Sequence, residues 1–320
     1  MLAKCYDEAL KSNPNDSHAW TMRGVMWYEK GIYNEAIDCC DKSTNLNPND
    51  SMTWRVKAQA LECKGLYGEA ITCYNKVIAL DPTDFGAWKR KGVLLCHSNQ
   101  YSKAIECFNE AIKLNPNDFG TWLSKGNALK QNGLYDEAIV CFDEAIKLNS
   151  DDTHICWKEK ALVFMAKRLH DKAIECFDKS IELDPNNYDV WKGKGAALNY
   201  IGLHDEAIIC YDEAIKLNSN DYGAWMGKGL TFSSKRLYDE AIVCYDEAIE
   251  LNPNDSDIWK FKGDILYHKG LYNEAGYCFK KAGYCNDENF KSKKRKRTFI
   301  WITVLVIVSA LLILLFGLGK

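Results

Sequence analysis

Catalytic sequence motifs are missing from this chain of 320 residues, and proline and histidine are scarce, with six of each. The sequence contains no Walker A loop, no His-Glu-x-x-His zinc motif and no Gly-x-Ser-x-Gly nucleophile motif. Cys-x-x-Cys, a common signal for a zinc or redox site, is also absent. We therefore expect a protein that is not an enzyme and that uses no cofactor and no metal ion.

The few prolines are regularly placed, and tryptophan follows the same period. Eight tryptophans recur every 34 residues, with one step of 35 residues: Trp20, Trp54, Trp88, Trp122, Trp157, Trp191, Trp225 and Trp259. A Gly or Ala stands four residues after each of these marker tryptophans, and an invariant Ala stands sixteen after. All six prolines share one position of the period. A fixed period of this length is typical of a stacked repeat protein, which offers a long surface instead of one pocket.

The spacing inside each period is helical, because small and apolar residues recur at intervals of four, seven and eight. Between the two clusters of each period stands a glycine suited to a left-handed helix end, namely Gly31, Gly65, Gly133, Gly202 or Gly270. Asn99, Arg168 and Arg236 replace it in three periods, and arginine there costs about 1 kcal/mol. Asn-Pro-Asn-Asp then ends the second helix and caps the next. Each period is therefore predicted to be two antiparallel helices.

The ordered series of Trp, Gly, a large apolar residue, Tyr or His, Ala, an aromatic residue and Pro resembles the tetratricopeptide repeat. The resemblance implies an all-α fold, a right-handed superhelical solenoid of antiparallel helix pairs with a concave groove lined by the first helices. It predicts eight repeats, at residues 17–50, 51–84, 85–118, 119–153, 154–187, 188–221, 222–255 and 256–289.

Residues 1–16 match only the second helix of such a repeat. They either cap the stack or continue a longer array. We favour the longer array, because a cap needs a polar outer face and Leu2, Ala3 and Leu10 give little sign of one.

Nine of the fourteen cysteines occupy one position of the second helices: Cys5, Cys39, Cys73, Cys107, Cys141, Cys176, Cys210, Cys244 and Cys278. Successive helices of this kind lie too far apart for disulfides. We therefore expect small buried hydrophobic residues in a reducing compartment.

Residues 298–318 form one uncharged apolar stretch, TFIWITVLVIVSALLILLFGL, which as a helix would be about 30 Å long and would cross a bilayer. A basic linker at 290–297 precedes it, with Lys291, Lys293, Lys294, Arg295, Lys296 and Arg297. The positive-inside rule keeps this flank, and the repeats with it, in the cytoplasm, and the flank would also attract anionic lipid headgroups. The chain therefore resembles a single-pass, tail-anchored membrane protein, with a nuclear-localisation signal as the other interpretation of the basic run. The membrane would be the plasma membrane in a prokaryote, and the endoplasmic reticulum or the mitochondrial outer membrane in a eukaryote.

Charge is divided between the repeats and the end of the chain. Residues 290–320 contain seven Lys or Arg and no acid, which leaves 34 basic and 44 acidic residues in 1–289, a formal charge of −10. An acidic array binds nucleic acid poorly, so no nucleic acid partner is expected.

The residue after each marker tryptophan faces the groove, by the geometry that the resemblance implies. It is Thr21, Arg55, Lys89, Leu123, Lys158, Lys192, Met226 and Lys260, five of which are basic. We predict a peptide-binding groove for an acidic or C-terminal carboxylate segment of a protein partner, made by Arg55, Lys89, Asn127, Lys158, Lys192 and Lys260. The alternative is a solvated row of cations that balances nearby acids. A second cation three residues after each marker tryptophan is so regular that we interpret it as scaffold: Arg23, Lys57, Lys91, Lys125, Lys160, Lys194, Lys228 and Lys262.

A carboxylate clamp for the C-termini of Hsp70 and Hsp90 is not expected. In the family, that clamp needs Lys four residues before Asn on one first helix and Asn on the next. Here Leu123 precedes Asn127, and Glu159 stands where the second Asn is required.

The sequence as a whole predicts a membrane-tethered scaffold or receptor that recruits a protein partner to the cytoplasmic membrane face. The alternative is a structural or self-association role with no specific groove ligand. Recruitment is favoured because the residues after the tryptophans vary while the packing positions hardly change.

Overall fold

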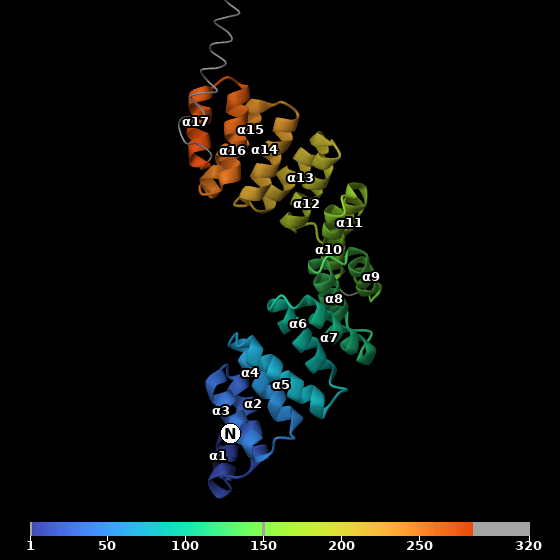
Figure 1. Cartoon of the computed structure of the whole chain (residues 1–320), viewed down its shortest axis with the longest axis vertical. Coiled ribbons are helices and arrows are strands. Elements are labelled where there is room, and N and C mark those ends of the chain that lie inside the picture. The colour runs from blue at the N-terminus through green and yellow to red at the C-terminus, as the bar shows by residue number, and fades with distance from the viewer. Residues whose placement is uncertain (1, 149–150, 284–320) are drawn as a thin grey trace, which may run out of the picture. The chain divides into compact units, whose positions relative to one another are not determined.

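The computed structural model describes residues 2–148 and 151–283, and every regular element in these ranges is an α-helix (Figure 1). The helices are α1 (Leu2–Ser12), α2 (Ser17–Glu29), α3 (Tyr33–Leu46), α4 (Ser51–Cys63), α5 (Tyr67–Leu80), α6 (Phe85–His97), α7 (Tyr101–Leu114), α8 (Phe119–Gln131), α9 (Tyr135–Lys147), α10 (Thr153–Ala166), α11 (His170–Leu183), α12 (Tyr188–Tyr200), α13 (His204–Leu217), α14 (Tyr222–Ser234), α15 (Tyr238–Leu251), α16 (Ser256–His268) and α17 (Tyr272–Lys281).

The predicted basic linker at 290–297 and the predicted transmembrane helix at 298–318 lie outside the described residues. Within 2–148 and 151–283, no helix combines the length and the apolar character that a bilayer span requires.

The described helices fall into two compact units, α1 to α10 and α11 to α17, divided between Arg168 and Leu169. The division lies within the predicted repeat 154–187, between α10 and α11. In the first unit, from blue to green in Figure 1, each of α3, α5, α7 and α9 packs against the first helix of its own pair and against the next first helix. In the second unit α13 and α15 do the same.

First helices also contact one another directly. These contacts join α2 to α4, α6 to α8 and α8 to α10 in the first unit, and α12 to α14 and α14 to α16 in the second. The first helices of each unit thus form a layer of their own, whose surface we call the first-helix face.

Small residues on the first helices allow the close approach of aromatic rings from the second helices. A Cβ added to Gly126 of α8 would lie 2.5 Å from Cε1 of Phe142 on α9, and Phe142 is fully buried. The invariant alanines beside these rings are all fully buried, at Ala36, Ala70, Ala104, Ala138, Ala173, Ala207, Ala241 and Ala275. The helix pair is therefore held together by a repeated contact of a small residue with an aromatic ring.

Eight of the nine regularly placed cysteines are buried, as predicted: Cys39, Cys73, Cys107, Cys141, Cys176, Cys210, Cys244 and Cys278. All of these are free thiols in the structure. The ninth, Cys5, lies outside the residues whose side chains the structure describes. Burial raises the pKa of Cys141, Cys210 and Cys244 to about 11, so these thiols are neutral at physiological pH. They pack as small hydrophobic groups.

The left-handed joints inside the repeats are also confirmed. Asn99, Arg168 and Arg236 have φ angles of 55°, 58° and 62°, and Gly31, for comparison, has 75°. The residue type changes while the backbone conformation is kept, because the joint sets the angle between the two helices of a pair.

Candidate binding face on the first helices

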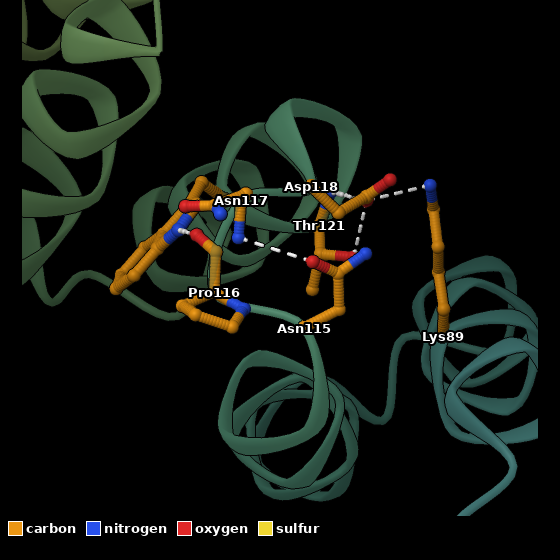
Figure 2. Close-up of polar contacts among 7 residues, drawn as sticks. Lys89, Asn115, Pro116, Asn117, Asp118 and Thr121 are labelled. Atoms are coloured by element: carbon orange, nitrogen blue, oxygen red, sulfur yellow. Dashed lines mark hydrogen bonds and ion pairs between the residues drawn. The ribbon is translucent and has the colours of Figure 1, made fainter.

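The marker tryptophans fix the turn that leads into each first helix. The indole Nε1–H of Trp122 donates to the carbonyl oxygen of Pro116 at 2.8 Å, and the backbone N–H of Asn117 donates to Oδ1 of Asn115 at 3.2 Å (Figure 2). The same bond, from the indole N–H to the carbonyl oxygen six residues earlier, is made by Trp20, Trp54, Trp88, Trp191, Trp225 and Trp259. The same hydrogen bond thus holds the turn before each of these first helices, both where the turn reads Asn-Pro-Asn-Asp, as at 115–118, and where its sequence differs.

The aspartate that ends this turn caps the next helix and also binds a cation from the preceding first helix. Oδ2 of Asp118 accepts from the backbone N–H of Thr121 at 2.7 Å, from its hydroxyl at 2.6 Å, and from Nζ of Lys89 at 2.7 Å (Figure 2). Burial alone would raise the pKa of Asp118, but the hydrogen bonds from Lys89 and Thr121 outweigh it and lower the pKa. The carboxylate is therefore ionised near neutral pH.

The same link connects other first helices. Arg55 on α4 lies 2.9 Å from the cap of α6, Asp84, and Lys192 on α12 lies 2.6 Å from the cap of α14, Asp221. Asp189 is a second partner of Lys192, at 2.9 Å. Burial would lower the pKa of Lys192, but its hydrogen bonds to Asp221 and Asp189 raise it. Cations of the predicted groove thus bridge successive first helices.

The three remaining predicted groove residues, Lys158, Lys260 and Asn127, do not share this arrangement. Lys158 lies 3.8 Å from Oε1 of Glu159, and Lys260 is half-buried on α16. Oδ1 of Asn127 is buried and has no hydrogen-bond partner in the described part of the chain. A buried amide oxygen without a donor costs about 1–3 kcal/mol, which makes Asn127 a candidate to accept a hydrogen bond from a ligand.

The three uncharged residues that follow marker tryptophans, Thr21, Leu123 and Met226, contact the interior of the protein. Thr21 is fully buried, and its hydroxyl lies 2.8 Å from that of Ser43 and 3.3 Å from Oδ2 of Asp50. Leu123 and Met226 pack against the apolar cores of their repeats. We call the eight residues after the marker tryptophans, from Thr21 to Lys260, the variable row.

The partner of the variable row was not foreseen from the sequence, although a signal was present. The capping aspartate lies 29 residues after the cation in each pair, as in Arg55 with Asp84 and Lys89 with Asp118. A search for acids at the start of the next first helix would have found it. Arg55, Lys89 and Lys192 therefore each have a carboxylate of the chain itself as a partner. Such pairs are what the alternative interpretation, a row of cations that balances nearby acids, requires.

The second row of cations, three residues after each tryptophan, is part of the scaffold. We call it the constant row. Seven of its members lie over the ring of their own tryptophan, with 5.2 to 6.0 Å between the charge and the ring centroid: Arg23, Lys57, Lys91, Lys125, Lys160, Lys194 and Lys228. Such cation–π contacts contribute about 0.5–1 kcal/mol at exposed sites.

The basic membrane-flanking residues Lys291, Lys293, Lys294, Arg295, Lys296 and Arg297 lie outside the described residues. Within the described ranges, no group of three or more His, Cys, Asp or Glu side chains is arranged to hold a metal ion.

Comparison with protein families agrees with the repeat geometry. Family models described as tetratricopeptide repeat match residues 3–51, 54–84, 86–118, 120–152, 154–187, 188–221 and 222–255, which is most of the chain. The chain belongs to the tetratricopeptide repeat (TPR) family. Repeats of this family form scaffolds for protein–protein interaction. No curated protein matches the chain.

Solved structures share the TPR fold. The C-terminal part of a TPR protein from Cytophaga hutchinsonii is 17% identical, with a TM-score of 0.63, and the match covers 75% of this chain and 98% of that one. A TPR protein from Parabacteroides merdae is 14% identical, with a TM-score of 0.57, covering 78% and 98%. YrrB, a TPR protein with an unusual peptide-binding site, is 20% identical, with a TM-score of 0.50, covering 62% and 97%.

Proposed function

We propose that this TPR protein is a membrane-tethered scaffold that recruits a protein partner to the cytoplasmic membrane face through the first-helix face. The observation that carries the proposal is the variation of the variable row beside packing positions that hardly change. The variable row changes among Thr, Arg, Lys, Leu and Met, while the alanine sixteen residues after each tryptophan never changes. Variation beside invariant packing positions is expected where contacts with a partner, and not packing, select the residues.

The ligand proposed for this face is an acidic segment or a C-terminal carboxylate. The side chains of Arg55, Lys89 and Lys192 stay 44%, 31% and 32% exposed in their ion pairs. A partner carboxylate would share these cations with the capping aspartates, and charge-assisted hydrogen bonds of this kind are short and strong. The amide of Asn127 would accept from a backbone N–H of the bound segment. YrrB, which shares the fold, is described as having a peptide-binding site, and this supports a peptide ligand by analogy.

The membrane tether is proposed from the sequence of residues 290–318. A basic linker followed by 21 uncharged, mostly apolar residues is the pattern of a single-pass anchor with its basic flank in the cytoplasm. The host membrane would be the plasma membrane in a prokaryote, and the endoplasmic reticulum or mitochondrial outer membrane in a eukaryote. Deleting residues 298–318 should release the protein from membranes that otherwise retain it through carbonate extraction, and retention of the deletion variant would contradict the tether.

The recruitment test captures cytosolic proteins on the immobilised full-length chain in detergent. The test variant replaces three cations of the variable row with Gln: Lys89, Lys158 and Lys192. The matched control removes the same charge from the constant row by replacing Lys125, Lys194 and Lys228 with Gln. Glutamine is chosen because glutamate at 89 or 192 would face Asp118 or Asp221 and disturb the caps.

A partner that the native chain and the control retain and that the test variant loses, at unchanged helicity, would identify the first-helix face as the recruitment surface. A partner retained equally by both variants would contradict this assignment. Recovery of the chain alone would favour the structural or self-association role.

A further inference from the structure

The constant row has a regular acidic partner on the preceding second helix. The cations and acids pair as Arg23 with Asp7, Lys57 with Asp41, Lys160 with Asp143, Lys194 with Asp178, Lys228 with Asp212 and Lys262 with Asp246. Two repeats break the rule. Asn75 stands where Lys91 would find its acid, and Asn109 stands where Lys125 would find its own.

The first break coincides with a groove of about 1070 Å³ between two second helices. Its walls come from α5 and α7, and its floor is Trp88, Lys91 and Leu95 of α6. The ammonium of Lys91 lies 5.3 Å from the centroid of the Trp88 ring, and the side chain is half-buried. A cation therefore lies in the floor of an open groove, on the side of the array formed by the second helices.

The groove is open because a second side chain is also missing there. Gly68 lines it from α5, and a Cβ added to Gly68 would meet nothing within 4 Å. In three other repeats the equivalent position holds an aspartate paired with a lysine, namely Asp136 with Lys167, Asp205 with Lys235 and Asp239 with Lys269. Gly68 and Asn75 together remove two carboxylates from this surface.

No ion pair of Lys91 is found in the described part of the chain, although two acids line the groove. Glu110 is engaged by Lys113 at 2.6 Å, and Glu106 lies on the same helix, α7. The other lysine of the groove, Lys103, donates to Gln100 at 2.9 Å. The cation at the floor of the groove, Lys91, thus lacks the internal carboxylate that six other members of the constant row have.

We propose that this groove, which we call the Lys91 groove, binds an acidic peptide segment of a partner protein, with one Asp or Glu side chain on Lys91 in place of the missing aspartate. Ile71, Leu95 and Ile112 line the same groove and supply contact for an apolar residue next to that acid. A carboxylate held by Lys91 in a partly desolvated site gains a charge-assisted hydrogen bond. The site lies on second helices and α6, and it is separate from the variable row.

A corresponding groove near the end of the repeats provides a matched control. It measures about 400 Å³ and contains Trp259, Lys262 and Leu266 in the register of Trp88, Lys91 and Leu95. There the cation already has its internal acid, because Lys262 is paired with Asp246. The two grooves therefore differ in whether the lysine at the floor has an internal aspartate.

The experiment measures binding of a short fluorescent peptide of alternating leucine and aspartate, capped at both ends, to the full-length chain in nanodiscs of neutral lipid. The capped ends remove any terminal carboxylate, and neutral lipid removes charge from the support. Lys91→Met deletes the cation, and Asn75→Asp supplies the internal carboxylate while keeping the size of the side chain. We expect each variant to weaken binding by about tenfold or more, the loss of one charge-assisted bond. Lys262→Met should leave the affinity unchanged.

Four results would overturn the proposal. These are no binding by the native chain, native affinity in Lys91→Met, native affinity in Asn75→Asp, and an equal loss in Lys262→Met, which would indicate general attraction of the peptide to lysine. Helicity measured on each variant ensures that only folded protein is compared. Asn75→Asp is the most informative variant, since it adds an ion pair and is expected to keep the fold intact.

Discussion

The variable row and the constant row lie two residues apart on the same helices, and cations of both rows lie beside aspartates of a neighbouring helix or of its cap. Lys192 of the variable row reaches forward to Asp221, whereas Lys194 of the constant row reaches back to Asp178. Each cation also lies over an aromatic ring, Lys192 at 5.4 Å from the centroid of Tyr188 and Lys194 at 6.0 Å from that of Trp191. The difference lies in the ring, because Trp191 fixes the turn between repeats.

The aspartates explain why one row is free to vary. Asp221 accepts from the backbone N–H of Gly223 at 2.8 Å, so it caps its helix whether or not a lysine approaches. Asp255 does the same for the backbone N–H of Asp257 at 2.9 Å, and the preceding residue of the variable row is Met226. Loss of the cation therefore leaves the cap intact. A face can change its charge for a partner when its local structure does not depend on that charge.

The largest expected effect is a loss of stability at alkaline pH, caused by the buried cysteines of the second helices. Cys141, Cys210 and Cys244 are buried with pKa values raised to about 11, whereas an unfolded thiol has a pKa of about 8.5. The unfolded chain therefore releases these protons first as pH rises. The stability from each neutral thiol is fully present below about pH 8.5 and is lost progressively towards pH 11, at about 1.4 kcal/mol per pH unit.

Urea unfolding followed by circular dichroism between pH 8 and pH 10.5 measures this loss, over about two units of pH above the unfolded thiol pKa. Replacing the three cysteines with alanine should reduce the slope of the profile, while Cys40, Cys96 and Cys156, whose pKa values burial also raises, keep part of it. A profile with the same slope in the triple variant would show that other groups cause the alkaline loss.

The next largest effect is expected from substitution at the contact between the two helices of a pair. Gly126→Ala places a Cβ at 2.5 Å from Phe142, whose ring is fully buried and cannot move aside freely. We expect a loss of about 1–3 kcal/mol in the free energy of unfolding, the usual cost of overpacking a core.

Gly68→Ala is the matched control, because the new methyl group meets nothing within 4 Å and lies in helix α5. This variant should unfold at the same urea concentration as the native chain or a slightly higher one. Equal destabilisation by the two alanines would mean that helix propensity, and not the aromatic contact, governs the glycine positions.

Much of this fold could be predicted from periodicity. Burial of the cysteines and the left-handed conformation of Asn99, Arg168 and Arg236 followed from position alone, because each repeat must reproduce the same packing and the same joint. These features depend on residues close in sequence, which the 34-residue period displays directly.

The candidate site was less predictable, because its character depends on pairs that join successive first helices across a full helix pair. The sequence marked Lys89 as a groove cation but did not reveal Asp118, 29 residues later, as its partner. Position alone also suggested that Thr21 faces the groove, whereas it is fully buried in a cluster of hydroxyl groups with Ser43 and Thr53. The Lys91 groove arises from absent side chains at Gly68 and Asn75, which a search for conserved positions passes over.

The smallest expected effect compares the two rows on one helix. Arg55→Met removes a cation that is 44% exposed and whose aspartate, Asp84, keeps its cap through the backbone N–H of Ala87, so we expect a cost of about 0.5 kcal/mol or less. Lys57→Met removes the ion pair with Asp41 together with the contact over Trp54, at 5.5 Å from the ring centroid, and we expect about 1 kcal/mol. Both variants remove one positive charge from α4, so the change in net charge cancels in the comparison. Urea midpoints measured in parallel at neutral pH give the difference, which should shrink at high salt as the ion pairs are screened. Equal costs at the two positions would mean that the variable row is as much a part of the scaffold as the constant row, and its variation would then need an explanation other than a partner.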